Sequence, residues 1–174
     1  MNTTLSSRNV KKIPQLALRL GTLPDDAVHW HDGIGVPYLG GEIYLRLSTE
    51  DFVAWLDGDI LHLPLPPAAS ARQIQDSAEA WLRQQCLAKV EAVFTLLQNR
   101  QLVLTTRRHL NFQLSFATRA PWIVAEDADT LRCNWRLIEH SPQTIAQHAE
   151  KALRQLHALQ HEGATVDMFG ALPA

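Results

Sequence analysis

Histidine is the residue type in this chain that most strongly suggests chemistry. The 174 residues include eight histidines, and imidazole is both the commonest metal ligand and the side chain that titrates nearest neutral pH. His157 and His161 are four residues apart, so a helix would place them on one face, where they could bind zinc together with His148 or Glu150. The apolar stripe of that helix centres near Leu156, however, which puts both histidines on the polar face and favours ordinary surface residues.

The other histidines and the cysteines give weaker indications. His29 and His31 would share one face of a strand, with Asp32 as a neighbouring carboxylate, but the sequence names no third ligand for a metal there. Cys133 alternates with apolar residues and is therefore expected in the core and not as a nucleophile. No glycine-rich phosphate loop or serine nucleophile motif occurs. Three further histidines are isolated and are expected to have no chemical role: His62, His109 and His140.

Composition limits the classes of partner. With 16 Lys and Arg against 18 Asp and Glu, the net charge is −2, which argues against nucleic acid or an acidic membrane surface as the partner. No apolar run approaches the roughly 18 residues that span a bilayer, and no signal peptide is recognisable. Two cysteines cannot form a disulfide framework, so we expect a cytoplasmic protein in which Cys86 and Cys133 are free, buried thiols.

The elements that must position these residues indicate a single α+β domain over residues 13–163, between a flexible N-terminus at 1–12 and a flexible tail at 164–174. Gly40-Gly41 and Asp57-Gly58-Asp59 predict tight turns in a run of short strands between about 28 and 66. Apolar residues at three- and four-residue spacing predict a helix from Ser70 to Asn99 and another from Ser141 to Gly163. β-rich and alternating runs predict strands between the helices, at 102–105, 110–116, 121–124 and 131–137.

Several residues are arranged as in a known family. The arrangement begins with Leu114-Ser115-x-Ala117-x-Arg119 and Trp122, and continues through the block Leu131-Arg132-x-Asn134-Trp135-Arg136-Leu137-Ile138 to Pro142 and Ile145. It extends towards the N-terminus through Trp30-x-Asp32-Gly33, Pro37-Tyr38-Leu39-Gly40 and Trp81-Leu82, so that it covers roughly residues 28–162. In these residues the chain resembles the YgjP-like metallopeptidase family, which is similar to the SprT-type zincins. The resemblance implies a zincin-like fold.

The residues that would carry the family's chemistry are replaced in this chain. The last helix of the family carries His-Glu-x-x-His, in which two histidines bind zinc and the glutamate activates the zinc-bound water. The matching window here is Lys151-Ala152-Leu153-Arg154-Gln155, so both helix ligands and the general base are missing. The family's Trp-Gly-Ser-Cys strand is matched by Trp122 followed by Ile123-Val124-Ala125, and only His161 falls near the position of the third ligand.

The resemblance therefore predicts a non-catalytic, metallopeptidase-like domain that has lost its zinc site and binds a protein or peptide partner without a cofactor. Its cleft would lie between the strands at 122–138 and the last helix, and the expected lining is Trp122, Arg132, Asn134, Arg136, Lys151 and Gln155. Such side chains suit an acidic or extended peptide. Two alternatives stay open: a subunit of a larger assembly, and a zinc-dependent hydrolase with the displaced ligands His148, His157 and His161.

Overall fold

Two hairpins form the N-terminal sheet of the computed structural model, which describes residues 29–100, 110–117 and 121–169, the last nine of these by their backbone alone. The strands of this sheet are β1 (Gly35–Tyr38), β2 (Gly41–Leu47), β3 (Trp55–Asp57) and β4 (Ile60–Leu63), in the order β1-β2-β4-β3. The β1–β2 and β3–β4 pairs are antiparallel, whereas β2 and β4 run parallel. Both predicted hairpins are confirmed, although Phe52 and Val53 precede β3 instead of belonging to it.

The tip of the first hairpin packs against a distant part of the chain. Leu39 and Gly40 form the turn with φ angles of 49° and 82°, one residue earlier than the sequence predicts. The N–H of Leu39 donates to the carbonyl oxygen of Ile138 at 2.7 Å, and the N–H of Gly40 donates to that of Glu139 at 3.1 Å. A Cβ atom on Gly40 would lie 3.0 Å from the Cα of Ser141. This turn therefore requires glycine for its space as well as for its φ angle.

The long helix α1 (Ala71–Arg100) follows the first sheet and ends one residue beyond the predicted Asn99. Its start has the predicted capping box. The N–H of Gln73 points to the hydroxyl of Ser70 at 3.4 Å, and the N–H of Ser70 donates to the side-chain oxygen of Gln73 at 2.9 Å. The apolar stripe expected from the spacing is buried from Ile74 to Phe94, except for Val93, which like Leu97 is half-buried. The helix is confirmed, and so is most of its buried face.

The C-terminal sheet has three strands, β5 (Asn111–Ser115), β6 (Ile123–Ala125) and β7 (Thr130–Asn134), in the order β5-β7-β6. β5 is parallel to β7, and β6 is antiparallel to it. The strand predicted at 131–137 is wrong beyond Asn134, because Trp135–Glu139 forms a short 3-10 helix, η1. The strand predicted at 102–105 lies outside the described residues.

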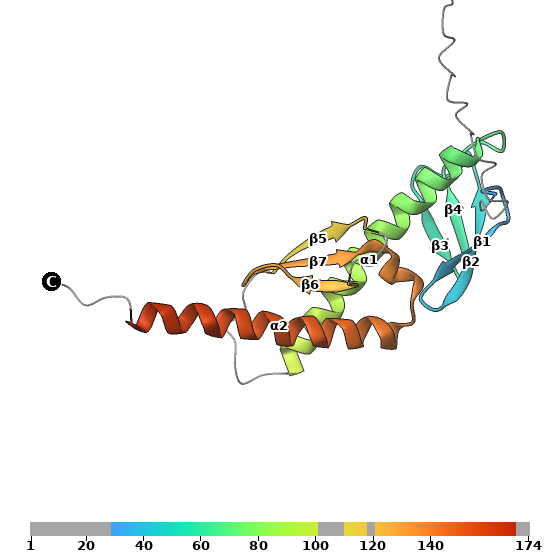
Figure 1. The fold of residues 1–174 in the computed structure, drawn as a ribbon. Coiled ribbons are helices and arrows are strands. Elements are labelled where there is room, and N and C mark those ends of the chain that lie inside the picture. Colours follow the sequence, from blue (N-terminus) through green and yellow to red (C-terminus); the bar gives the residue numbers. More distant parts are fainter. Residues whose placement is uncertain (1–28, 101–109, 118–120, 170–174) are drawn as a thin grey trace, which may run out of the picture.

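The last helix, α2 (Pro142–Phe169), begins at the predicted position and runs past its predicted end. The hydroxyl of Ser141 accepts a hydrogen bond from the N–H of Thr144 at 3.3 Å, which caps the first turn. Gly163 does not end the helix, since one glycine inside a helix costs only about 1 kcal/mol relative to alanine. The predicted tail is therefore helical as far as Phe169, and Figure 1 shows α2 extending beyond the sheet that it covers.

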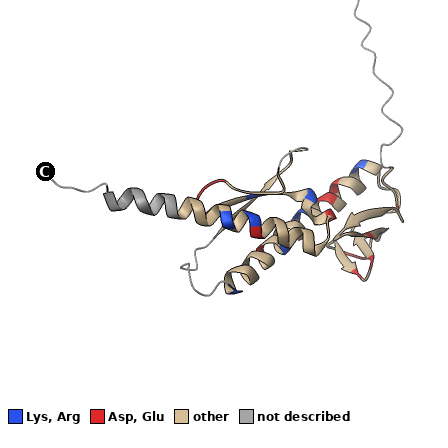
Figure 2. Cartoon of the chain, turned by 60° about the horizontal axis from the view of Figure 1, so that its bottom comes forward, with Lys and Arg blue, Asp and Glu red and all other residues tan. Residues whose placement is uncertain are grey.

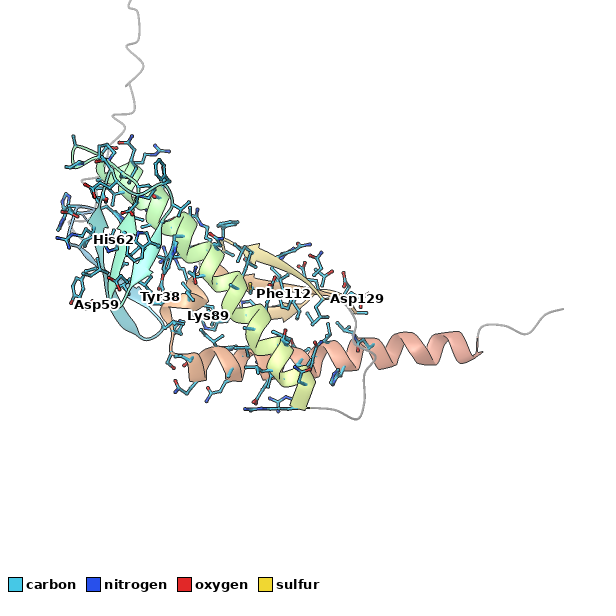
Figure 3. The ribbon with its side chains drawn as sticks, turned by 180° about the vertical axis from the view of Figure 1, so that it is seen from behind. Tyr38, Asp59, His62, Lys89, Phe112 and Asp129 are labelled. Atoms are coloured by element: carbon cyan, nitrogen blue, oxygen red, sulfur yellow. The ribbon has the colours of Figure 1, made fainter. Side chains whose placement is uncertain are left out.

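Helix α1 joins the two sheets around one core. It contacts β4, β5, η1 and α2, and a single hydrophobic cluster takes side chains from both sheets and both long helices. Figure 3 shows Tyr38 and Phe112, from the two sheets, beside α1, where their ring centres lie 5.4 Å from Trp81 and 5.5 Å from Phe94. The predicted α+β class is confirmed. Among the described residues, no helix combines the length and apolar character that a membrane span requires.

Candidate functional site

A pocket of about 430 Å³ opens where β1, the first half of α1 and η1 meet. Its most buried apolar side chains are Val36 and Leu82, which are 2% and 3% exposed, and its lining also includes three charged residues, Glu79, Arg136 and Glu139. We call it the Trp30–Trp135 pocket after its two tryptophans. Its lining consists of Trp30, Gly35, Val36, Pro37, Gln75, Glu79, Leu82, Trp135, Arg136 and Glu139.

Trp135 forms one wall of the pocket and is held by two arginines. The guanidinium carbons of Arg83 and Arg136 lie 5.2 Å and 4.8 Å from the centre of its ring, within the range of cation–π attraction. Each guanidinium is paired with a carboxylate on its own helix, Arg83 with Glu79 and Arg136 with Glu139, the latter at 2.9 Å. These contacts order the wall before any ligand arrives.

The carboxylates of Glu79 and Glu139 keep capacity to accept further hydrogen bonds. Glu79 accepts from Arg83 and, at 2.8 Å, from the Gln75 amide, while Glu139 accepts from Arg136. Two carboxylate oxygens offer about four lone-pair sites. The Glu79 and Glu139 side chains are 13% and 27% exposed, so they remain within reach of N–H donors on a ligand in the pocket.

Of the residues in the predicted cleft, Arg136 lines this pocket and two others have different surroundings. Arg132 lies in a smaller pocket of about 170 Å³ on the second sheet and pairs with Glu126 at 2.6 Å. Asn134 is buried, and its amide group donates to the carbonyl oxygen of Ala117 at 2.7 Å, while its side-chain oxygen accepts the N–H of Arg136 at 3.0 Å. The two arginines are thus paired with carboxylates of the same chain, and both polar atoms of the Asn134 side chain are hydrogen bonded to its backbone.

The remaining three residues of the predicted cleft lie around the first half of α2. The ring centre of Trp122 is 4.5 Å from that of His140 and 6.3 Å from that of His148. Burial, with the added effect of His140 and Lys151 nearby, lowers the pKa of His148 below its usual value. Lys151 and Gln155 are exposed one turn apart. Because the ammonium group of Lys151 repels cations, this surface disfavours a divalent metal.

Two of the three displaced metal ligands suggested by the sequence do not share a site. His148 and His157 are nine residues apart on α2, which places them on opposite sides of the helix and roughly 13 Å apart along its axis. The side chain of His161, like all of His109, lies outside the described residues. Within the described part of the chain, no three His, Cys, Asp or Glu side chains are grouped so that they could hold a metal ion.

The three described histidines nearest the N-terminus, His29, His31 and His62, lie outside the pocket. His29 and His31 lie in an irregular segment and not in the expected strand, and the carboxylate of Asp32 accepts a backbone N–H of β2 at 2.9 Å. His62, labelled in Figure 3, stacks on Trp55 with ring centres 4.3 Å apart. None of these side chains lines the Trp30–Trp135 pocket.

Sequence reasoning missed most of the pocket. The family resemblance is the only sequence feature that includes Trp30, and no motif marks Glu79 or Glu139. The sequence does contain one local signal. Glu79 and Arg83 have the four-residue spacing of an ion pair on one face of a helix. The pocket itself carries no sequence signature, since Trp30 and Trp135 are far apart in the sequence and line one pocket only in the folded chain.

Comparison with known proteins adds no functional information to the geometry of the pocket. The chain matches no family model, no curated protein and no solved structure.

Proposed function

We propose that this chain is a non-catalytic, metallopeptidase-like domain that holds an extended segment of a protein partner in the Trp30–Trp135 pocket. The observation that carries the proposal is the combination, in one pocket, of buried apolar side chains, a tryptophan wall held by two arginines and carboxylates that accept hydrogen bonds. Its volume of about 430 Å³ lies within the usual range of ligand pockets. Binding of this kind needs no cofactor.

The shape and the chemistry of the pocket suit an extended peptide with one large apolar side chain. That side chain would fill the space over Val36 and Leu82, in the manner of an interface anchor. The peptide N–H groups beside it would find acceptors on Glu79 and Glu139. Among the described residues, β1, which supplies part of the lining, is an edge strand, so one side of its backbone has no partner strand there. Such an edge can accept an added strand.

The charge of the pocket favours a neutral or basic peptide over an acidic one. Its lining carries two carboxylates, Glu79 and Glu139, against one guanidinium, Arg136. Arg136 is already bonded to Glu139 at 2.9 Å. An acidic side chain of a peptide would therefore lie near two carboxylates of like charge. The single guanidinium of the lining is already paired, so it would compensate this repulsion poorly.

The absence of catalysis in this proposal follows from the resemblance to YgjP-like metallopeptidases. The two helix positions that would match the family's zinc-binding histidines are Lys151 and Gln155, both exposed on α2. A lysine at a ligand position opposes metal binding by charge repulsion. We further propose that the protein works in the cytoplasm, where its two free cysteines stay reduced.

Selection of phage-displayed random peptides on the purified full chain tests the proposal. We expect enrichment of peptides that share one large apolar or aromatic residue. Isothermal titration calorimetry then measures the affinity of a synthetic peptide from the enriched set. The Trp30→Ala variant should bind that peptide at least tenfold more weakly, because removal of an anchoring tryptophan contact costs about 2 kcal/mol.

Trp55→Ala is the matched control for this measurement. Trp55 is also a tryptophan of the N-terminal sheet region, but it stacks on His62 and does not line the pocket. Its replacement should leave the Kd unchanged within twofold. The proposal is contradicted if no common residue is enriched, or if Trp30→Ala binds the peptide as tightly as Trp55→Ala does.

A further inference from the structure

The outer edge of β1 presents its backbone groups to the Trp30–Trp135 pocket. Tyr44, the partner of Gly35 on β2, donates its N–H to the carbonyl oxygen of Asp59 on the other side of β2 at 2.7 Å, so Gly35 and Tyr44 are a non-hydrogen-bonded pair. Such pairs alternate with bonded pairs along an antiparallel ladder, and Pro37 is therefore the next non-bonded position of β1. Gly35 and Pro37 both line the pocket, and their backbone groups point away from β2.

This edge is closed at one end by η1. Leu39 follows the outward-facing positions of β1 at the same two-residue interval, and its N–H donates to the carbonyl oxygen of Ile138 at 2.7 Å. The N–H of Gly40 donates to the carbonyl oxygen of Glu139 at 3.1 Å. A strand added to β1 therefore finds its place beyond the pocket already taken by η1. A chain that ends at this point fits, whereas a chain that continues has to turn out of the pocket.

The groups around the open edge are mainly hydrogen-bond acceptors. Proline has no N–H, so Gly35 and Pro37 together offer two carbonyl oxygens and a single N–H. Glu139 lines the same pocket, at the closed end. Its Oε1 accepts from Arg136 at 2.9 Å, while its Oε2 has no hydrogen-bond partner in the described part of the chain. A ligand rich in N–H donors is the one that suits this combination.

We infer that the Trp30–Trp135 pocket binds the free N-terminus of the partner chain, with its α-ammonium group at Glu139 and its first residues paired with β1. The inference rests on the proposed function, because it names the part of the partner that enters the same pocket. An α-ammonium group carries positive charge and three N–H donors, and its hydrogen bonds to a carboxylate are charge-assisted. Capture of a terminal amine is a known mode of peptide recognition.

Charge also selects the direction of the bound chain. An antiparallel strand on β1 brings its N-terminal end to the closed end of the edge, beside Glu139. A parallel strand would bring its C-terminal end there, and a terminal carboxylate would be repelled by Glu139 and by Glu79, which lines the pocket too. The apolar anchor of the proposed function then lies close to the N-terminus of the partner.

Calorimetric titration of one peptide in three forms, at a pH of 7 where an α-amino group is mostly protonated, tests the inference. The peptide is a lysine-free member of the enriched set, so that its α-amino group is its only ammonium. We expect the N-acetylated form to bind at least about tenfold more weakly than the free form, because acetylation removes a charge-assisted hydrogen bond. A form with three added N-terminal glycines keeps the ammonium but displaces it, and should also bind more weakly. The inference is overturned if all three forms bind equally, or if only lysine-containing peptides bind and their acetylation has no effect.

Two variants test the role of Glu139 in this preference. Glu139→Gln should reduce the difference between the free and acetylated forms to less than about threefold, because the amide keeps an oxygen but loses the charge. Glu126→Gln is the matched control. Glu126 also pairs with an arginine, Arg132, but it lies on the second sheet and outside the pocket, so this variant should keep the full difference.

The outcomes separate the inference from the proposed function. A Glu139→Gln variant that discriminates between the two forms as strongly as Glu126→Gln would overturn the assignment of the ammonium to Glu139. Equal binding of the free, acetylated and extended peptides to the wild-type chain overturns the inference and leaves the proposed function standing. If the wild-type chain binds no peptide in any form, both are wrong.

Discussion

The side chain of Asn134 ends β7 and begins η1. The alternation of apolar residues predicts a longer strand, with Asn134 on its outer face. Instead Asn134 is 4% exposed, and it bonds to the carbonyl oxygen of Ala117 and to the N–H of Arg136. This side chain serves as the cap of the 3-10 helix. The chain turns as a result, and Trp135 and Arg136 reach the pocket instead of continuing the sheet.

Asn134→Ala should therefore lower the free energy of unfolding by about 2 kcal/mol, because it removes a helix cap and leaves the carbonyl oxygen of Ala117 and the N–H of Arg136 without their partner. Urea unfolding monitored by circular dichroism measures this loss. Asn111→Ala is the control, since Asn111 is an exposed asparagine in β5 whose side chain makes no hydrogen bond within the described residues. Equal losses in the two variants would show that Asn134 does not hold the turn.

At the scale of the elements, the β1–β2 hairpin and the junction between η1 and α2 hold each other in place. The turn at Leu39 and Gly40 donates two backbone hydrogen bonds to carbonyl groups of η1, and the backbone of Ser141 lies where a side chain on Gly40 would be. β1 supplies one wall of the pocket and η1 supplies another. The docking of this hairpin therefore sets the distance between two walls.

Gly40→Ala should cost about 3 kcal/mol of stability, from the strain of a positive φ and the contact with the Ser141 backbone. Gly58→Ala separates the two causes. Gly58 also has a positive φ, of 60°, but a Cβ atom there would meet nothing within 4 Å, so its loss should be about 1 kcal/mol. Chemical denaturation of both variants measures the difference. If Gly58→Ala proves as destabilising as Gly40→Ala, the close approach to Ser141 has no energetic role.

The elements that could be predicted from the sequence are those whose signals are local. Three such signals are the capping box at Ser70, the apolar stripe of α1 and the glycine turns. Each depends on residues that are close together in the sequence. The errors have tertiary causes. η1 depends on the contact of Asn134 with Ala117, and the left-handed φ of Leu39 depends on the docking of its turn. The candidate site was predicted less well, because Trp30 and Trp135 come together only in the folded chain.

At the scale of the whole molecule, α1 is the element that unites the two sheets and gives the pocket its depth. It contacts the first sheet, the second sheet, η1 and α2, so the pocket opens at the junction of the main parts of the fold. Figure 2 shows acidic and basic residues interspersed along the helices in the described part of the chain. This distribution favours a partner that is recognised by shape and apolar contact over a polyanion.

The measurement that tests the central claim most directly is calorimetric titration of an enriched peptide into the full chain, before and after exhaustive treatment with EDTA, with mass spectrometry of the recovered peptide. Binding in the Trp30–Trp135 pocket uses no metal, so we predict the same Kd within twofold and an intact peptide in both samples. A tenfold loss of affinity after chelation, or peptide cleavage that EDTA abolishes, would contradict the account and would indicate a metal-dependent hydrolase.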